Sequence, residues 1–326
     1  MGTSQKISVV IVSYNTREIL RACIEQLFAV TKDMDIEVIL VDNASRDLSA
    51  EMVEESFPMV KLIRSKVNLG FAGANNLGFK EATGKYILLL NPDALVEEGA
   101  MQKSLAYIEA NPDIGMGGGK LIDRNGQMQP SARLYPSLLN EFLVLTGLAF
   151  RYPKSQFFGR FDRTWDDSGQ PTRVDWVPGA FTLIRKTALN QVGVFDPRFF
   201  LYYEEVDLCY RFNKVNWQIW YWPDVLVKHW GGESSKTVEH VEISSSGSQL
   251  TLWRMRSALM YYRKHHGALT TALVAMLEGG WHWIRALRAR LQGNKEKERE
   301  SMNVVKLMRR AWSETRGGKV CPPTPW

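Results

Sequence analysis

The chain has few cysteines. Its 326 residues contain three, Cys23, Cys209 and Cys321, which lie far apart and match no metal-binding spacing. An odd, sparse set of this kind provides no disulfide framework, so the small disulfide-stabilised class of secreted domain is excluded. We therefore expect reduced thiols, as in a cytoplasmic protein.

Long apolar runs are also lacking. No stretch reaches about 18 uninterrupted apolar residues, the length at which a membrane-spanning helix is predicted. The chain enters a strand-like pattern by Ile7, without the basic stretch and apolar core of a secretory signal. This pattern predicts that the protein is not secreted by that route.

A dinucleotide fingerprint is absent as well. No G-x-G-x-x-G motif occurs, and Gly117-Gly118-Gly119 does not supply one. Its absence argues against a nicotinamide-dependent dehydrogenase. The turn Asn68-Leu-Gly-Phe-Ala-Gly remains a plausible phosphate site, because glycines let backbone amides approach a ligand.

Acidic residues are scarce near the end of the chain. Residues 251–326 carry 15 Lys or Arg against 5 Glu, a net charge of +10, whereas residues 1–250 carry 26 basic and 30 acidic residues, a net charge of −4. A protein built around nucleic acid would carry positive charge on its main body. We therefore expect no nucleic-acid partner.

The first positive feature of the sequence is a regular alternation of apolar runs and helical patterns. Strands are predicted at residues 7–12, 36–41, 60–63 and 86–90, and helices at residues 16–30, 49–57 and 73–83. This alternation predicts an α/β fold with a mainly parallel central sheet flanked by helices. From about residue 112 to 173 the pattern weakens, which predicts an irregular insertion carrying an acceptor site or a lid.

Acidic residues stand where apolar segments end. Glu204 and Glu205 open a predicted helix, whose dipole favours their ionised form. Asp42 and Asp93 each follow a predicted strand. Because ligands of such sheets bind at the carboxyl ends of the strands, these residues predict one cleft. His229 precedes two glycines, which would leave its ring accessible.

Each of these residues also has an ordinary structural interpretation. Glu204 and Glu205 fit a solvated first helical turn, and Asn91-Pro92-Asp93 fits a turn. Asp42 would serve as a cap, and His229 as a structural histidine. The local patterns alone leave both interpretations open.

Seven segments, taken in order, resemble the family-2 glycosyltransferases. They are VVIVSYN, VDNAS, NLGFAGANN, LLLNPDA, GAFTLIRK, FDPRFFLYYEEVDLC and HWGG. Within that family the chain most resembles the rhamnosyltransferase-type enzymes of bacterial surface-polysaccharide assembly, over roughly residues 5–235. The resemblance implies the Rossmann-like GT-A fold, a nucleotide-sugar donor and a divalent cation, Mg²⁺ or Mn²⁺.

The resemblance also implies roles for individual residues. Asp42 would read a pyrimidine base. Asn91-Pro92-Asp93 stands at the position of the Asp-x-Asp metal motif with an amide replacing the first carboxylate. Asp93 is therefore the expected metal ligand, with His229 as a further one, and pyrophosphate and water supply other oxygens. The residues implied to contact the donor nucleotide are Ser13, Tyr14, Asn15, Asp42, Asn68, Gly70 and Asn91.

Glu205 matches the general base of the family's paired-carboxylate motif. Many relatives have Asp there, so Glu204 is kept as the alternative base. The implied chemistry is a single displacement in which the base removes the acceptor hydroxyl proton and the configuration at the sugar carbon inverts.

The implied reaction moves a sugar, L-rhamnose from dTDP-rhamnose, to a hydroxyl of a glycan or lipid-linked glycan. A UDP-hexose or UDP-N-acetylhexosamine donor stays open, because Asp42 can read either pyrimidine. From other classes, a sugar nucleotidyltransferase would need a basic glycine-rich loop where this chain has Ser13-Tyr14-Asn15. A non-catalytic nucleotide-sugar-binding protein would be indifferent to loss of Glu205.

The segments predict a catalytic domain over residues 1–235 and a basic, Trp-containing helical extension over residues 236–326. The nucleotide-sugar half is expected at about residues 1–110 and the acceptor half at about residues 111–235. In the extension, residues 281–291 combine aromatic, aliphatic and basic side chains, as amphipathic interfacial helices do. This predicts peripheral attachment to the inner face of the cytoplasmic membrane, with packing on the catalytic domain or a partner subunit as the alternative.

Overall fold

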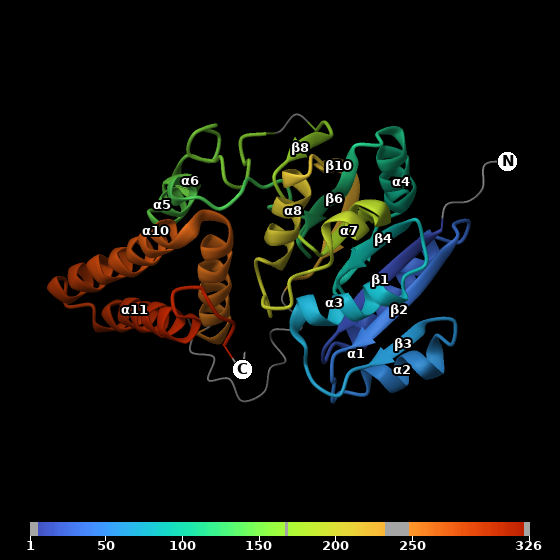
Figure 1. Cartoon of the computed structure of the whole chain (residues 1–326), viewed down its shortest axis with the longest axis horizontal. Helices are drawn as coiled ribbons and strands as arrows, with labels where there is room; N and C mark the ends of the chain where they lie inside the picture. The colour runs from blue at the N-terminus through green and yellow to red at the C-terminus, as the bar shows by residue number, and fades with distance from the viewer. Residues whose placement is uncertain (1–5, 167–168, 232–247, 323–326) are drawn as a thin grey trace. The chain divides into compact units, whose positions relative to one another are not determined.

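The computed structural model describes residues 6–166, 169–231 and 248–322 (Figure 1). Its described residues form two compact units. The first draws on residues 6–135, 166, 169–196 and 205–231, and the second on residues 136–165, 197–204 and 248–322. The domain boundary expected at residues 235 and 236 lies outside the described residues.

The first unit contains a sheet with the strand order β3-β2-β1-β4-β9-β6-β10-β5. Its first four strands are mutually parallel, with Ile7 opposite both Ile36 and Tyr86. Strands β1, β2 and β4 are largely apolar runs, as expected for strands buried on both faces, whereas the edge strand β3 begins and ends with an exposed charged residue. The bounds are β1 Ile7–Ser13, β2 Ile36–Asp42, β3 Lys61–Arg64 and β4 Tyr86–Leu90. The predicted α/β alternation is confirmed here.

The other half of the sheet is mixed. Strand β9 runs antiparallel to both β4 and β6, whereas β6 and β10 are parallel. Asn91 N donates to Ala180 O, so β9 begins beside the point where β4 ends and must run the opposite way. The bounds are β5 Ala94–Val96, β6 Ile114–Ile122, β7 Met128–Gln129, β8 Thr172–Val174, β9 Phe181–Arg185 and β10 Gln218–His229.

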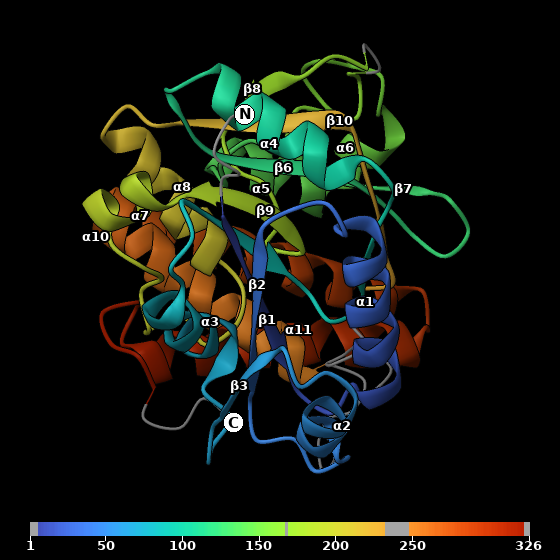
Figure 2. The ribbon, with the colours of Figure 1, turned by 90° about the vertical axis from the view of Figure 1, so that its right-hand side faces the viewer.

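Helices of the first unit cover both faces of the sheet. Figure 2 shows α1 and α2 on one side of β1, β2 and β3, and α3 on the other. The strand order reverses between β1 and β4, and in α/β sheets such a reversal opens the crevice in which ligands bind. The bounds are α1 Arg17–Val30, α2 Ser49–Ser56, α3 Gly70–Glu81, α4 Ala100–Ala110, α7 Lys186–Val192 and α8 Glu204–Lys214.

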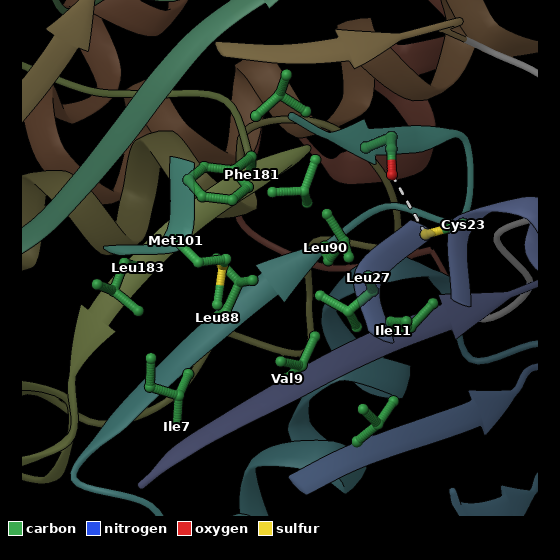
Figure 3. Packing of buried hydrophobic residues seen from close by; sticks show 14 of the residues in the cluster. Ile7, Val9, Ile11, Cys23, Leu27, Leu88, Leu90, Met101, Phe181 and Leu183 are labelled. Carbon is green, nitrogen blue, oxygen red and sulfur yellow. Dashed lines mark hydrogen bonds between the residues drawn. The ribbon is translucent and has the colours of Figure 1, made fainter. Parts of the chain in front are cut away.

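The core of this unit lies between β1, β4, β9 and helices α1 and α4. Figure 3 shows Ile11, Leu27, Leu88 and Phe181 converging there, each almost fully buried. Cys23 is part of the same core, and its Sγ donates to Ala94 O at 3.2 Å. Burial raises the pKa of the Cys23 thiol, with the charge of Asp93 adding to the effect, so this cysteine is unreactive.

Part of the weak pattern at residues 112–173 conceals regular structure, so the expectation of an irregular insertion was wrong for Ile114–Ile122, whereas residues 152–166 consist of turns and loop. Strand β6 lies in the middle of the sheet, and its three consecutive glycines hide it from apolar periodicity. A Cβ on Gly117 would lie 2.1 Å from Trp222 Cη2, and a Cβ on Gly119 would lie 2.6 Å from Val225 O. The glycines are therefore needed for close packing against β10.

The second unit is helical, which confirms the expected helical C-terminal extension. The segment anticipated at residues 281–291 is the end of one long helix, which breaks at Gly267, where φ is 82°. No helix among the described residues is long and apolar enough to cross a membrane. The bounds are α5 Leu138–Leu145, α6 Leu148–Arg151, α10 Ser248–Leu291 and α11 Lys295–Thr315.

Candidate active site

Three loops at the carboxyl ends of the parallel strands are tied together by hydrogen bonds. Ser13 and Asp42 are neighbours in the β1–β2 register, and Asn43 N donates to Ser13 O at 2.8 Å. Asn15, held at a φ of 52°, accepts from Arg46 N at 2.7 Å, and its own N donates to Ser45 Oγ at 3.0 Å. The loop holding Ser13, Tyr14 and Asn15 is thus fixed to the loop after Asp42.

Asp42 is a buried carboxylate with one oxygen left over. Its Oδ2 accepts from Ser45 N at 3.2 Å. Its Oδ1 is buried and has no hydrogen-bond partner among the described residues. Burial raises the pKa of Asp42, although hydrogen bonds from Ser45 oppose this shift. A buried acceptor without a hydrogen bond lowers the stability of the fold. A ligand that donates a hydrogen bond to Oδ1 would remove this cost, so Oδ1 is a candidate ligand contact.

Asn43 brings the third loop to the same place, a role that the sequence interpretation missed. Its Nδ2 donates to Asn68 Oδ1 at 2.9 Å, and its Oδ1 accepts from Leu69 N at 2.8 Å. Asn68 Oδ1 also accepts from Gly70 N at 2.8 Å, where α3 begins. The sequence signal that could have identified Asn43 is its place beside Asp42, directly after a largely apolar strand.

Asn91 and Asp93 meet His229, which stands 138 positions after Asn91 in the sequence, just beyond the end of β4. His229 Nε2 lies 3.4 Å from Asp93 Oδ1 and 3.5 Å from Asn91 Nδ2. Asp93 is 5% exposed, and its carbonyl accepts from Trp230 N at 2.9 Å. The structure therefore brings together Asn91, Asp93 and His229, as the sequence predicted for a single site.

Gln129, also missed from the sequence, sets the orientation of the His229 ring. Its Nε2 donates to His229 O at 2.9 Å, which leaves its Oε1 facing His229 Nδ1 at 2.7 Å. An amide oxygen only accepts, so Nδ1 must carry a proton. In the neutral ring the lone pair of Nε2 therefore points toward the Asp93 carboxylate, an arrangement suited to a cation between the two.

The protein supplies few metal ligands at this position. No group of three or more His, Cys, Asp or Glu side chains suited to a metal ion occurs in the described ranges. Asp93 and His229 are two such residues, so any cation here would need oxygens from a ligand or water.

Glu205 is connected to this cluster through the loop before β9. Gly179 N donates to Glu205 Oε1 at 3.5 Å, and Ala180 O accepts from Asn91 N at 3.0 Å. A Cβ on Gly179 would lie 3.0 Å from Phe71 Cζ, so a larger residue would press on Phe71 where the loop passes α3. One short loop thus contacts both the predicted base and the predicted metal motif.

The other acidic residues of α8 differ from Glu205. Glu205 is partly exposed, whereas Glu204 and Asp207 are buried. Asp207 Oδ2 accepts from Arg211 Nε at 2.8 Å, which gives it a structural ion pair within the helix. Of the three carboxylates, Glu205 is the one that solvent or a ligand reaches.

Comparisons with known proteins identify the family of the chain. The model of the family described as glycosyl transferase family 2 matches residues 8–207. An N-acetylglucosaminyl-diphospho-decaprenol L-rhamnosyltransferase of Mycobacterium tuberculosis is 29% identical over 88% of this chain and 89% of its own. Rhamnosyltransferase WbbL of Escherichia coli is 24% identical over 78% of this chain and 91% of its own.

Solved structures share the fold. A mannosyltransferase from Pyrobaculum calidifontis, in complex with GDP-Man and Mn²⁺, has a TM-score of 0.55 at 13% identity, covering 97% of this chain and 88% of its own. GalNAc-T7, solved with UDP, GalNAc and Mn²⁺, has a TM-score of 0.57 at 15% identity, covering 99% of this chain and 59% of its own. The fold is therefore of the GT-A type. With the family model covering most of the chain, this protein belongs to glycosyl transferase family 2.

Proposed function

We propose that this glycosyltransferase moves L-rhamnose from dTDP-rhamnose to a hydroxyl of a lipid-linked glycan, with inversion at the sugar carbon. The observation that carries the proposal is the loop of Gly179 and Ala180, which contacts Glu205 on one side and Asn91 on the other. A base and a donor site would then be neighbours. The names of the Mycobacterium tuberculosis and Escherichia coli relatives support rhamnose as the sugar.

The donor nucleotide would bind at the carboxyl ends of β1 and β2. The free Oδ1 of Asp42 suits the N3–H group that thymine and uracil present. Ser13, Tyr14 and Asn15 would border the base. Asn68 and Gly70 stand at the start of α3, where backbone amides and the helix dipole favour the pyrophosphate.

Asp93 and His229 would hold a divalent cation, with the Asn91 amide beside them. The Nε2 lone pair facing the Asp93 carboxylate fits Mn²⁺, which accepts imidazole as well as oxygen ligands, and Mg²⁺ would use the carboxylate. When bound, the cation would neutralise charge on the departing nucleoside diphosphate. The Mn²⁺ in the two related structures supports this assignment.

Glu205 would act as the general base. Gly179 N–H donates to one carboxylate oxygen of Glu205, and the side chain is partly exposed, so an acceptor could reach it. As the acceptor oxygen bonds to the sugar carbon, its proton passes to Glu205, and the bonding pair of the carbon–phosphate oxygen bond leaves with the nucleoside diphosphate. Attack opposite the leaving group inverts the configuration. Glu204 remains the alternative base.

A lipid-linked acceptor would place the reaction at a membrane surface. The M. tuberculosis relative is named for a substrate with a diphospho-decaprenol group, which supports an acceptor of this class. Because nucleotide sugars are soluble, we propose that the enzyme is cytoplasmic and works at the inner face of the membrane.

Isothermal calorimetry with dTDP, UDP, GDP and ATP, each with and without Mn²⁺, tests the donor site. We expect dTDP to bind more tightly than GDP or ATP, and Mn²⁺ to strengthen that binding. Metal-enhanced binding of UDP in preference to dTDP would redirect the proposal to a UDP-sugar donor. Preference for ATP, or no nucleotide binding, would refute it.

A further inference from the structure

Helix α10 carries an exposed apolar stripe after its break at Gly267. The side chains of this stripe are between 38% and 80% exposed. Their spacing of mostly three or four residues places them on one face of the helix. The stripe, called the α10 stripe below, consists of Leu269, Leu273, Met276, Trp283, Ile284, Leu287 and Leu291.

The stripe is not the face with which α10 packs in its own unit. Thr271, Val274, Ala286 and Ala289 lie on another face and are buried. Helix α11 packs along α10, with Met308 Cγ 3.8 Å from a Cβ built on Gly279 (Figure 1). Helix α10 therefore has a covered face and, in addition, the apolar stripe that faces outward.

In the last part of α10, the charges beside the stripe have one sign. Arg285, Arg288 and Arg290 are exposed, and no acidic residue occurs from Gly279 to Asn294. At about 100° per residue, Arg288 falls on one side of the stripe and Arg290 on the other. The preceding acidic residue, Glu278, is buried and paired with Arg254.

We propose that the α10 stripe docks onto the headgroup region of an anionic lipid bilayer. The leucine, isoleucine and methionine side chains would enter the outer acyl region, and Trp283 would lie at the interface. Arginines can lay their apolar stems along the lipid while their guanidinium groups bind the phosphates. Arg288 and Arg290, on the two sides of the stripe, would therefore attract the negatively charged headgroups. The proposal rests on the proposed function only in that a lipid-linked acceptor gives such docking a purpose.

The first test is sedimentation of the full chain with vesicles of phosphatidylcholine, alone or mixed with phosphatidylglycerol. We expect binding to the mixed vesicles that weakens at high salt. The double variant Trp283→Glu, Leu287→Glu should bind about tenfold more weakly or worse, because carboxylates would have to enter the apolar layer. Met59→Glu, which alters an exposed methionine of the first unit, is the matched control and should bind like the wild type.

A second variant tests the charged rim. Arg288→Gln with Arg290→Gln should weaken binding to the mixed vesicles by roughly fivefold for each arginine and reduce its salt dependence. The proposal would be overturned if the wild-type chain did not bind the mixed vesicles, or if the double glutamate variant bound them as tightly as the wild type. So would a concentration-dependent dimer in analytical ultracentrifugation that the double glutamate variant abolishes, because the stripe would then join two copies.

Nucleotide binding by the same variants keeps the two proposals apart. Each vesicle-binding variant should bind dTDP with unchanged affinity, because its substitutions lie on α10. A wild type that binds dTDP but does not bind the mixed vesicles would remove only the docking proposal. Intact vesicle binding by a wild type that binds no nucleotide would remove only the proposed function.

Discussion

Glu205 is the residue on which the proposed chemistry depends. In Glu205→Gln the amide keeps the size of the side chain but cannot take up the acceptor proton. We expect kcat to fall by about 10²- to 10⁴-fold, while dTDP affinity stays nearly unchanged. Glu204→Gln is the matched control and should retain most activity. Full activity in Glu205→Gln would remove Glu205 as the base, and loss of activity only in Glu204→Gln would assign that role to Glu204.

Asp42 gives the nucleotide site a pH dependence. Burial raises the pKa of Asp42 in the free protein, so its carboxyl takes up a proton at a higher pH than an exposed aspartate does. When Oδ1 carries the proton, one of its lone pairs forms the O–H bond, so Oδ1 is a poorer hydrogen-bond acceptor for the base. Affinity for dTDP should therefore be high above this pKa and fall as the pH is lowered through it.

Calorimetry of metal-free protein across the acidic range measures this effect without the pH dependence that metal binding would add. Asp42→Asn should bind dTDP more weakly at neutral pH and show a flatter profile, because the amide does not titrate. A wild-type profile that matches that of Asp42→Asn would show that Asp42 does not contact the base.

Gln129 should affect the metal without touching it. Gln129→Met removes the acceptor for the proton on His229 Nδ1, so the ring loses its fixed tautomer and orientation. We expect Mn²⁺ affinity to fall by about tenfold or more, as measured by electron paramagnetic resonance of free Mn²⁺ in the presence of dTDP. Gln102→Met, which alters an amide bonded to Val30 O, is the control and should leave affinity unchanged.

At the scale of elements, β6 shows where sequence patterns stop being informative. Strands β1, β2 and β4 could be predicted because each is mostly a run of large apolar residues. Strand β6 is equally buried, but its glycines provide no apolar signal. Gly117, for example, is required because Trp222, about a hundred positions away in the sequence, fills the space above it.

Gly117→Ala tests this packing. The new methyl group would lie 2.1 Å from Trp222 Cη2, so β6 or the indole must shift. We expect the free energy of unfolding to fall by about 1–3 kcal/mol, measured by urea denaturation. Combining it with Trp222→Leu should cost less than the sum of the two single changes, since the leucine leaves room. Additive losses would mean that the two residues do not share this space.

At the scale of the whole molecule, the sequence indicated which residues to propose for the site but not which contacts position them. Asp42, Asp93 and His229 could be proposed from motifs, because each follows an apolar run or precedes glycines. Gln129 and Gly179 could not, since their roles are contacts with residues distant in the sequence. The roles proposed for the motif residues stay predictions until activity is measured.

The most direct test of the account is transfer itself. Purified full-length protein would be incubated with dTDP-L-rhamnose, Mn²⁺ and an N-acetylglucosaminyl-diphospho-lipid acceptor, and the product analysed by mass spectrometry and by NMR of its anomeric proton. We predict a product one rhamnose heavier, with the configuration at the sugar carbon opposite to that of the donor, and none when the metal is chelated. Retained configuration, or no transfer from any dTDP- or UDP-sugar under these conditions, would contradict the account.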